Sequence, residues 1–265
     1  MASTRLFGEK KGPNESRALG IDARVDTTGV TVAVAVGRTA GVGSRSGLAL
    51  FSLPKELPKE TDWEALIRGD LNSKVQWLPL QDVRDVKLSR DGKWALAAAG
   101  IEGLALVDLE KKQVVLKTNP LVGAVADRVL LSNDQKRVFV SFISSGTTNP
   151  ADPTKAVGPS VAIQVYNFDQ GKLGLWGQIK GLSLVELPYG ARAPGLALSS
   201  DDLYLYAANG KEGLWIYNVS DPSQPVLITK LSTHGQAAGV AVGERYKNVY
   251  IADLVNGLEM AEFGF

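Results

Sequence analysis

The sequence has 265 residues, 45% of them hydrophobic, and its 29 basic and 28 acidic side chains leave a net charge of +1. This length accommodates one large β domain or two smaller domains with a sizeable core. The near-neutral charge gives no reason to expect nucleic acid or an anionic membrane as a partner. The absence of cysteine excludes disulfides, thiolate metal sites and cysteine nucleophiles.

The first predicted unit consists of strand-like segments at Ala23–Asp26, Val30–Val36 and Gly47–Leu53. An unusual segment, residues 54–79, follows it. Within that segment Thr61 and Glu64 have the spacing of a capping box, which marks the start of a helix. We therefore expect one short helix near 62–66, packed on the outside of the first unit.

A repeated pattern begins at the second unit. Gly103, Gly213 and Gly257, each followed by leucine, lie 14 residues after Ser89, Ser199 and Gly243, which close short strand-like segments. The closing residues Ser89 and Ser132 are 43 residues apart, and Ser199 and Gly243 are 44 apart. A period of about 40–50 residues is typical of the four-stranded blades of a β-propeller.

The third unit repeats the pattern with an insertion. Its predicted strands are Val129–Ser132, Arg137–Phe142 and Val161–Tyr166, and the polar, glycine-rich stretch between the last two predicts a long hairpin tip. The middle strands of all units are nearly continuously apolar. This is expected where neighbouring sheets cover both faces of a strand.

These observations predict an all-β fold, a five-bladed β-propeller of four-stranded antiparallel blades in a single domain. The blades would span roughly 21–80, 81–122, 123–188, 189–232 and 233–265. One sheet of about 44 residues cannot bury both faces alone, whereas stacked sheets can. The last blade stops after its third strand. We expect Thr4–Phe7 within residues 1–10 to supply the missing outer strand, the alternative being that more chain follows.

The stretch Gly213–Pro225, GLWIYNVSDPSQP, resembles the LVIVD-repeat family, in which the strand after Gly-Leu continues into a Val-Ser-Asp-Pro turn. The resemblance is strong in the fourth blade and partial in the second and fifth. It implies a β-propeller, often within bacterial surface or exported proteins, and it implies no particular chemistry. An extracytoplasmic or cell-surface location is therefore favoured, although residues 1–20 contain no signal sequence.

Candidate binding residues lie near the ends of the predicted inner strands, at the mouth of the central channel. They are Asp22, Asp82, Asp85, Asp127, Arg192 and His234. A ring of carboxylates there would suit calcium, as in propeller hydrolases that resemble lactonases. Glycine stands at 195 and 239, the positions equivalent to Asp85, so such a ring would be incomplete. Salt bridges with Arg84, Arg128 and Arg192, or solvated loop ends, are therefore favoured over a metal site.

The resulting prediction is a non-enzymatic protein-interaction or scaffold module without a cofactor. It would present its top face and the inserted loops 37–46 and 144–160 to a protein partner or to other domains of a larger assembly. Membrane insertion is not expected, because no apolar run approaches the ~18 residues of a membrane helix. The alternatives are a calcium-dependent propeller hydrolase, with those carboxylates as its ligands, and a carbohydrate-binding module.

Overall fold

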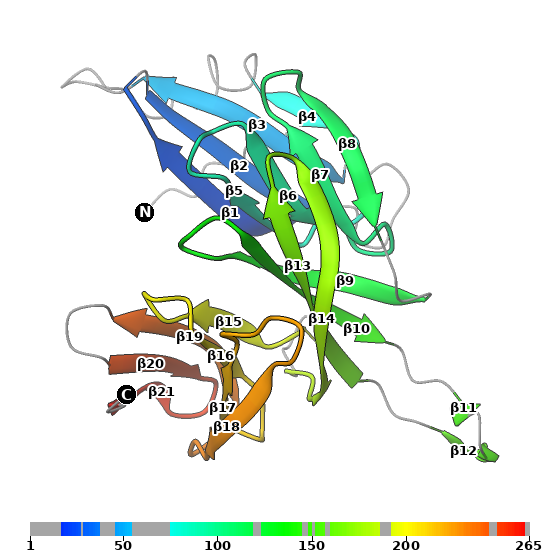
Figure 1. The fold of residues 1–265 in the computed structure, drawn as a ribbon, viewed down its shortest axis with the longest axis vertical. Coiled ribbons are helices and arrows are strands. Elements are labelled where there is room, and N and C mark those ends of the chain that lie inside the picture. The colour runs from blue at the N-terminus through cyan, green and yellow to red at the C-terminus, as the bar shows by residue number, and fades with distance from the viewer. Residues whose placement is uncertain are drawn as a thin grey trace, which may run out of the picture. The chain divides into compact units, whose positions relative to one another are not determined.

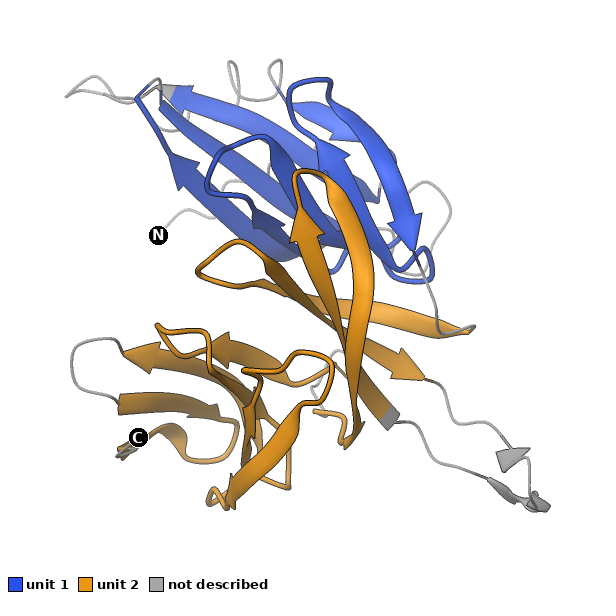
Figure 2. Cartoon of the chain, viewed as in Figure 1, with its two compact units in different colours: residues 1–118 blue, residues 119–265 orange. Residues whose placement is uncertain are grey.

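Antiparallel β-sheets make up the described part of the chain, which divides into two compact units, residues 1–118 and 119–265 (Figure 2). The structure is a computed structural model. It describes residues 17–27, 29–37, 46–54, 75–118, 123–144, 148–149, 152–156, 160–185, 192–243 and 248–262. The expected helix at 62–66 and the expected closing strand Thr4–Phe7 lie outside these residues. In the part described, no helix is long and apolar enough to cross a membrane.

The first unit contains two four-stranded sheets whose strands follow one another in chain order (Figure 1). The first sheet comprises β1 (Arg17–Val25), β2 (Gly29–Gly37), β3 (Gly47–Pro54) and β4 (Gln76–Leu78). The second comprises β5 (Asp85–Leu88), β6 (Trp94–Ala98), β7 (Leu104–Asp108) and β8 (Gln113–Thr118). The inner strand β5 contacts β1 and β2. Small and aliphatic residues such as Ala33, Leu48, Ala95 and Val107 form one core between the two sheets.

The second unit contains three further sheets of the same kind. The third sheet has β9 (Ala124–Leu131), β10 (Arg137–Ser144), β13 (Ser160–Asp169) and β14 (Lys172–Leu182), and the hairpin β11 (Thr148–Asn149) and β12 (Asp152–Ala156) is inserted into it. The fourth has β15 (Gly195–Leu198), β16 (Tyr204–Ala208), β17 (Leu214–Asn218) and β18 (Val226–Leu231). The fifth has β19 (Ala237–Gly243), β20 (Asn248–Asp253) and β21 (Gly257–Glu262). Within the described residues this last sheet has three strands.

The predicted β-propeller fold is confirmed at the level of these sheets. Each begins with an inner strand, and in the second and fourth sheets Gly103 and Gly213 enter the third strand with φ of +81° and +77°. At Gly213 a side chain is also excluded by the outer strand, because a Cβ would lie 2.1 Å from the Leu231 carbonyl oxygen. Gly103 and Gly257 share its positive φ, which favours glycine.

A second repeated feature is a hydrogen-bonded serine–aspartate pair in the turn after the inner strand of the second, third and fourth sheets. In the fourth sheet the Ser199 hydroxyl donates to Asp201 at 2.5 Å and accepts from the Tyr204 N–H at 2.9 Å. The same carboxylate accepts from the Leu203 N–H at 3.1 Å. Equivalent serine–aspartate pairs, Ser89–Asp91 and Ser132–Asp134, occupy the second and third sheets. The turn is thus built by side chains that replace missing ladder hydrogen bonds.

Acid is expected to destabilise the fold through these turns. The Ser199 hydroxyl and the Leu203 N–H lower the pKa of Asp201 below its ordinary 3.8, against a smaller opposite effect of burial. For Asp91 and Asp134 burial is the largest single cause and raises the pKa, but the serine and backbone hydrogen bonds together lower it below 3.8. Such carboxylates stabilise the folded state above the unfolded pKa, and this stabilisation disappears as pH falls through the folded pKa.

We therefore expect the free energy of unfolding in urea to be lower at about pH 3 than at about pH 6. The Asp91→Asn/Asp134→Asn/Asp201→Asn variant should be less stable at the higher pH and should lose less stability on acidification. If the wild type and this variant lost equal stability between the two pH values, the three turn aspartates would not be the cause of the acid sensitivity.

Candidate functional site

Each of the three predicted site residues of the first unit is bound to another group of that unit. The Asp22 carboxylate on β1 accepts a hydrogen bond from the Leu88 N–H of β5 at 2.7 Å. Asp82, with φ of +50°, forms an ion pair with Arg84 at 2.8 Å. Asp85 accepts from the adjacent Val86 N–H at 2.9 Å. The Asp22 contact joins the inner strands of the first two sheets, and the Asp82–Arg84 pair is one of the salt bridges that the sequence predicted.

In the second unit, the buried Asp127 and the partly buried Arg192 form an ion pair. Asp127 is 0% exposed, and its carboxylate lies 2.8 Å from Arg192 Nε. It also accepts from the Ala193 N–H at 2.8 Å, and Arg128 Nε lies 3.8 Å away. The pair links the inner strand β9 of the third sheet to the segment that leads into β15. Its geometry is that of a structural ion pair with little access from solvent.

His234 lies at the surface, with its side chain 83% exposed. Its Nδ1 is 3.2 Å from a Glu259 carboxylate oxygen, and its backbone N–H donates to the other oxygen at 3.0 Å. The contact ties the loop before β19 to β21. The histidine therefore belongs to the fifth sheet. Its described partner is the Glu259 carboxylate, and the contacts described for it do not include the serine or threonine hydroxyl of a catalytic triad.

The incomplete ring of acids has a steric explanation at one position. A Cβ on Gly195 would lie 2.8 Å from the Gly239 Cα, so β19 approaches β15 too closely for aspartate at position 195, whereas a Cβ on Gly239 would meet only the Ala252 Cβ, at 3.5 Å. Among the described residues, no group of three His, Asp or Glu side chains is placed to hold a metal ion. The residues that calcium would need are instead bound to backbone N–H groups and arginines.

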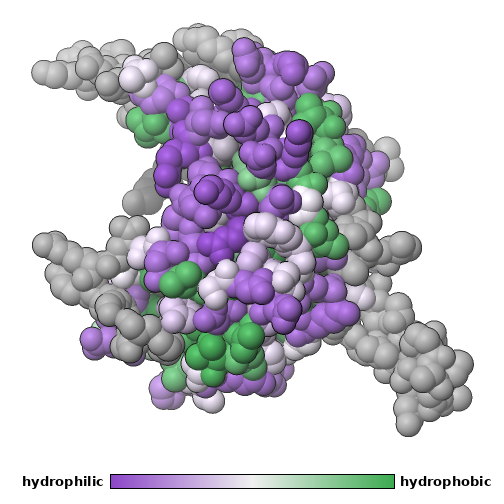
Figure 3. Space-filling view, viewed as in Figure 1, coloured by the Kyte–Doolittle hydropathy of each residue, from purple (hydrophilic) through white to green (hydrophobic). Residues whose placement is uncertain are grey.

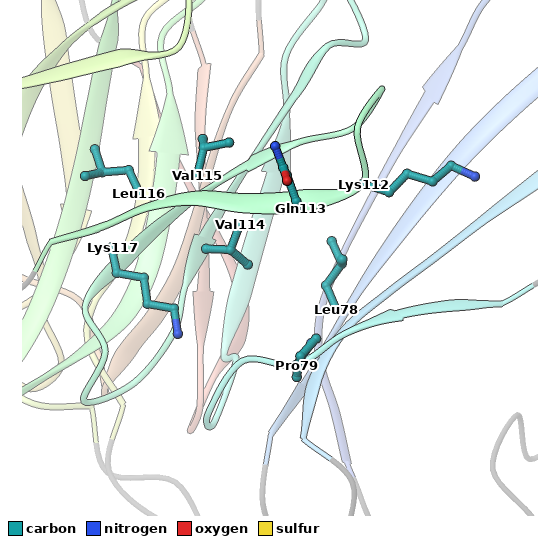
Figure 4. Close-up of a pocket in the computed structure, with 8 residues that line it drawn as sticks. All are labelled: Leu78, Pro79, Lys112, Gln113, Val114, Val115, Leu116 and Lys117. Atoms are coloured by element: carbon teal, nitrogen blue, oxygen red, sulfur yellow. The ribbon is translucent and has the colours of Figure 1, made fainter.

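A groove between β4 and β8 in the first unit was not predicted. Leu78 and Pro79 at the end of β4 line one side, and residues 112–117 of β8 and its preceding turn line the other (Figure 4). Each strand is the last in its sheet, so in the described structure it has a strand neighbour on one side only. An unpaired strand edge offers backbone N–H and C=O groups to another chain.

A β-bulge orients the side chains along the groove. Val107 pairs with Val114 and Leu106 with Leu116, which leaves Val115 as the extra residue. Val114 and Lys117 therefore point toward Leu78 and Pro79, whereas Val115 and Leu116 both point away (Figure 4). Val114 also packs on the core of the unit, so the floor of the groove is apolar.

The two charged residues that line the groove are both lysines. Lys112 and Lys117 line it, and Lys111 stands beside it, paired with Asp108 at 3.1 Å. Lys117 contacts Glu102 at 2.5 Å, and the second oxygen of Glu102 accepts from the Gln81 N–H at 2.8 Å. This arrangement fixes Lys117 above the apolar floor. The sequence signal was the stretch Lys111–Thr118, KKQVVLKT, which combines lysines with aliphatic residues in an outer strand.

The inserted loops of the sequence-based prediction lie mainly outside the described residues. Of loop 37–46 only the two ends are described, and of loop 144–160 the two ends and the backbone of β11 and β12. The top-face surface that those loops would form therefore stays a prediction.

Comparison with known proteins supports the fold. Residues 193–233 match the model of the LVIVD repeat, which confirms the resemblance in the fourth blade. No curated protein matches the chain. Two solved structures resemble the chain over 93% of its length, each with a TM-score of 0.62. They are Kuenenia stuttgartiensis hydrazine synthase, at 15% identity, and a functionally unknown protein from Desulfotomaculum acetoxidans DSM 771, at 14% identity.

The chain spans 72% of the first of these structures and 66% of the second. The β-propeller domain of Myceliophteria thermophila Cps50 (Swd1) matches over 87% of this chain and 66% of that one, with 14% identity and a TM-score of 0.55. At these identities the similarity establishes the β-propeller fold alone.

Proposed function

We propose that this propeller, which carries an LVIVD repeat, is a non-enzymatic protein-interaction module that binds an extended, acidic segment of a partner protein along β8. The observation that carries the proposal is the β4–β8 groove, because it combines a strand edge that has no neighbour among the described strands, an apolar floor and lysines. Addition of a strand to such an edge is a common mode of peptide recognition, in which backbone hydrogen bonds provide affinity and side-chain contacts provide specificity.

The chemistry of the partner follows from the two kinds of side chain that line the groove. An extended peptide places alternate side chains on opposite faces. Aliphatic residues on one face would contact Leu78, Pro79 and Val114, and carboxylates at the groove margins would approach Lys112 and Lys117. Figure 3 shows hydrophobic residues at the surface over β8, where Val115 and Leu116 are exposed. The partner would be another protein or another domain of the same assembly.

The test uses a fluorescein-labelled peptide of alternating valine and glutamate, with a valine–lysine peptide as the control ligand. Fluorescence anisotropy should show saturable binding of the acidic peptide and none of the basic one. Lys112→Glu should weaken binding by about tenfold and reduce its dependence on salt, since it replaces an attractive charge with a repulsive one. Lys172→Glu, which changes an exposed lysine on β14 of the other unit, should leave binding unchanged.

Two outcomes would contradict the proposal. One is equal binding of the acidic and basic peptides. The other is no peptide binding together with a calcium-dependent rise in melting temperature, which would favour the hydrolase through linkage of ligand binding to stability.

A further inference from the structure

Glu102, in the turn between β6 and β7, connects the two parts of the chain that border the β4–β8 groove. Its Oε1 accepts from Lys117 Nζ on β8 at 2.5 Å. Its Oε2 accepts at 2.8 Å from the backbone N–H of Gln81, which follows β4 two residues after Pro79. All of these residues belong to the first unit. One carboxylate therefore binds a donor from each side of the groove at the end where Lys117 lies (Figure 4).

These two donors are of the kind that the carboxylate of an extended ligand would need. A lysine ammonium makes a strong, charge-assisted hydrogen bond to a carboxylate, and a backbone N–H gives the contact a fixed direction. An acidic peptide along β8 would bring its own carboxylates to the same place. We call Lys117 Nζ and the Gln81 N–H the carboxylate subsite. In this structure a side chain of the protein itself occupies that subsite.

The fourth sheet offers a comparison for this contact. Glu212 stands directly before the glycine that enters the third strand, as Glu102 does in the second sheet. Lys230 and Lys117 are also equivalent, because each lies opposite the second residue of that third strand. Lys230 Nζ, however, lies 3.7 Å from the centroid of the Trp215 ring. The second sheet has alanine at that ring position, so the two sheets hold the same lysine in different ways and the Glu102 contact is no general requirement of the blade.

We infer that Glu102 competes with the acidic partner for the carboxylate subsite, so that the partner binds by displacing it. The inference rests on the proposed function and adds an autoinhibitory contact to it. The Lys117 side chain is 40% exposed and that of Glu102 19%, and ion pairs with this access to water contribute little to stability. Displacement exchanges one carboxylate for another on the same donors. The apparent affinity is then reduced by the fraction of molecules in which the subsite is free.

Removal of the competitor is expected to strengthen binding. Glu102→Ala should bind the fluorescein-labelled valine–glutamate peptide about tenfold more tightly than the wild type, as expected if the wild-type subsite is free in about a tenth of the molecules. Glu102→Gln keeps an oxygen for the Gln81 N–H and loses the charge, so its gain should be smaller. Glu212→Ala, the matched change in the fourth sheet, should bind like the wild type. A purely structural bridge predicts the opposite sign, because its loss would leave Lys117 less well positioned.

Acetate tests the subsite without the peptide, since it has the size and charge of the group that Glu102→Ala removes. Sodium acetate at neutral pH should raise the melting temperature of Glu102→Ala above its value in the same concentration of sodium chloride, through linkage of ligand binding to stability. The wild type and Glu212→Ala should melt at the same temperature in both salts.

The two measurements separate this inference from the proposed function. If Glu102→Ala binds the peptide no more tightly than the wild type does, the inference is overturned and the proposed function stands. If none of the proteins binds the peptide, the proposed function fails and the acetate measurement decides alone. A rise in melting temperature confined to the Glu102 variant would then support the carboxylate subsite, and equal melting temperatures in both salts would overturn it.

Discussion

Replacing Asp202 with alanine is expected to lower the free energy of unfolding by about 3 kcal/mol, among the largest effects of a single substitution in this chain. Asp202 belongs to the fourth sheet, but its carboxylate accepts hydrogen bonds from the turn of the third sheet. It accepts from the Asn133 N–H and side-chain amide, both at 2.9 Å, and from the Asp134 N–H at 2.8 Å. Because Asp202 is only 3% exposed, water cannot easily replace it.

Backbone conformation adds to this effect. Asp202 has φ of +60°, a region in which alanine is strained and glycine is not. Asp202→Gly removes the same carboxylate without that strain, so it should cost about 1 kcal/mol less than Asp202→Ala. Asp202→Asn keeps one acceptor and tolerates positive φ, and it should be the mildest of the three.

Urea unfolding followed by tryptophan fluorescence would rank the variants. Asp221→Ala is the matched control, because that carboxylate is also bound to a neighbouring serine and backbone N–H but lies in an exposed turn of the same sheet. It should cost well under half as much as Asp202→Ala. Equal losses for Asp202→Ala and Asp221→Ala would show that the contact between the turns contributes nothing to stability.

The repeats were predictable because they arise from local chemistry. A serine that closes an inner strand, an aspartate two residues later and a glycine before the third strand all act within one sheet, as the Ser199–Asp201 turn and Gly213 show. They therefore recur in the sequence at a regular spacing, which can be recognised without the structure. The LVIVD match, residues 193–233, falls on the fourth sheet, which carries all of these signals, as the second sheet also does with Ser89, Asp91 and Gly103.

Contacts between sheets were only partly predictable. Aspartates near arginines suggested salt bridges, and Arg84–Asp82 and Arg192–Asp127 confirm that interpretation. The sequence could not show that Asp22 binds the Leu88 N–H, because the partner is a backbone group 66 residues away. The groove was missed for a similar reason, since β4 and β8 belong to different sheets and meet only through folding.

Arg192→Met is expected to destabilise the protein by about 3 kcal/mol, because it leaves the fully buried Asp127 carboxylate without its closest cation. The Ala193 N–H at 2.8 Å and Arg128 Nε at 3.8 Å would remain. Neither replaces the 2.8 Å contact with Arg192 Nε. Methionine preserves most of the length of the arginine stem, so the loss reports mainly on charge.

A double-mutant cycle separates a structural ion pair from a ligand site. Asp127→Asn removes the charge that Arg192 balances, so in its presence Arg192→Met should cost about 1 kcal/mol, and the coupling energy should be about 2 kcal/mol. Urea unfolding of the four proteins gives this number directly. If Asp127 and Arg192 form only a structural ion pair, the acidic peptide should bind all four folded proteins equally. The ion pair lies in the second unit, whereas the β4–β8 groove lies in the first. Additive losses, with no coupling between the two positions, would mean that Asp127 and Arg192 do not stabilise one another and would reopen their assignment as binding residues.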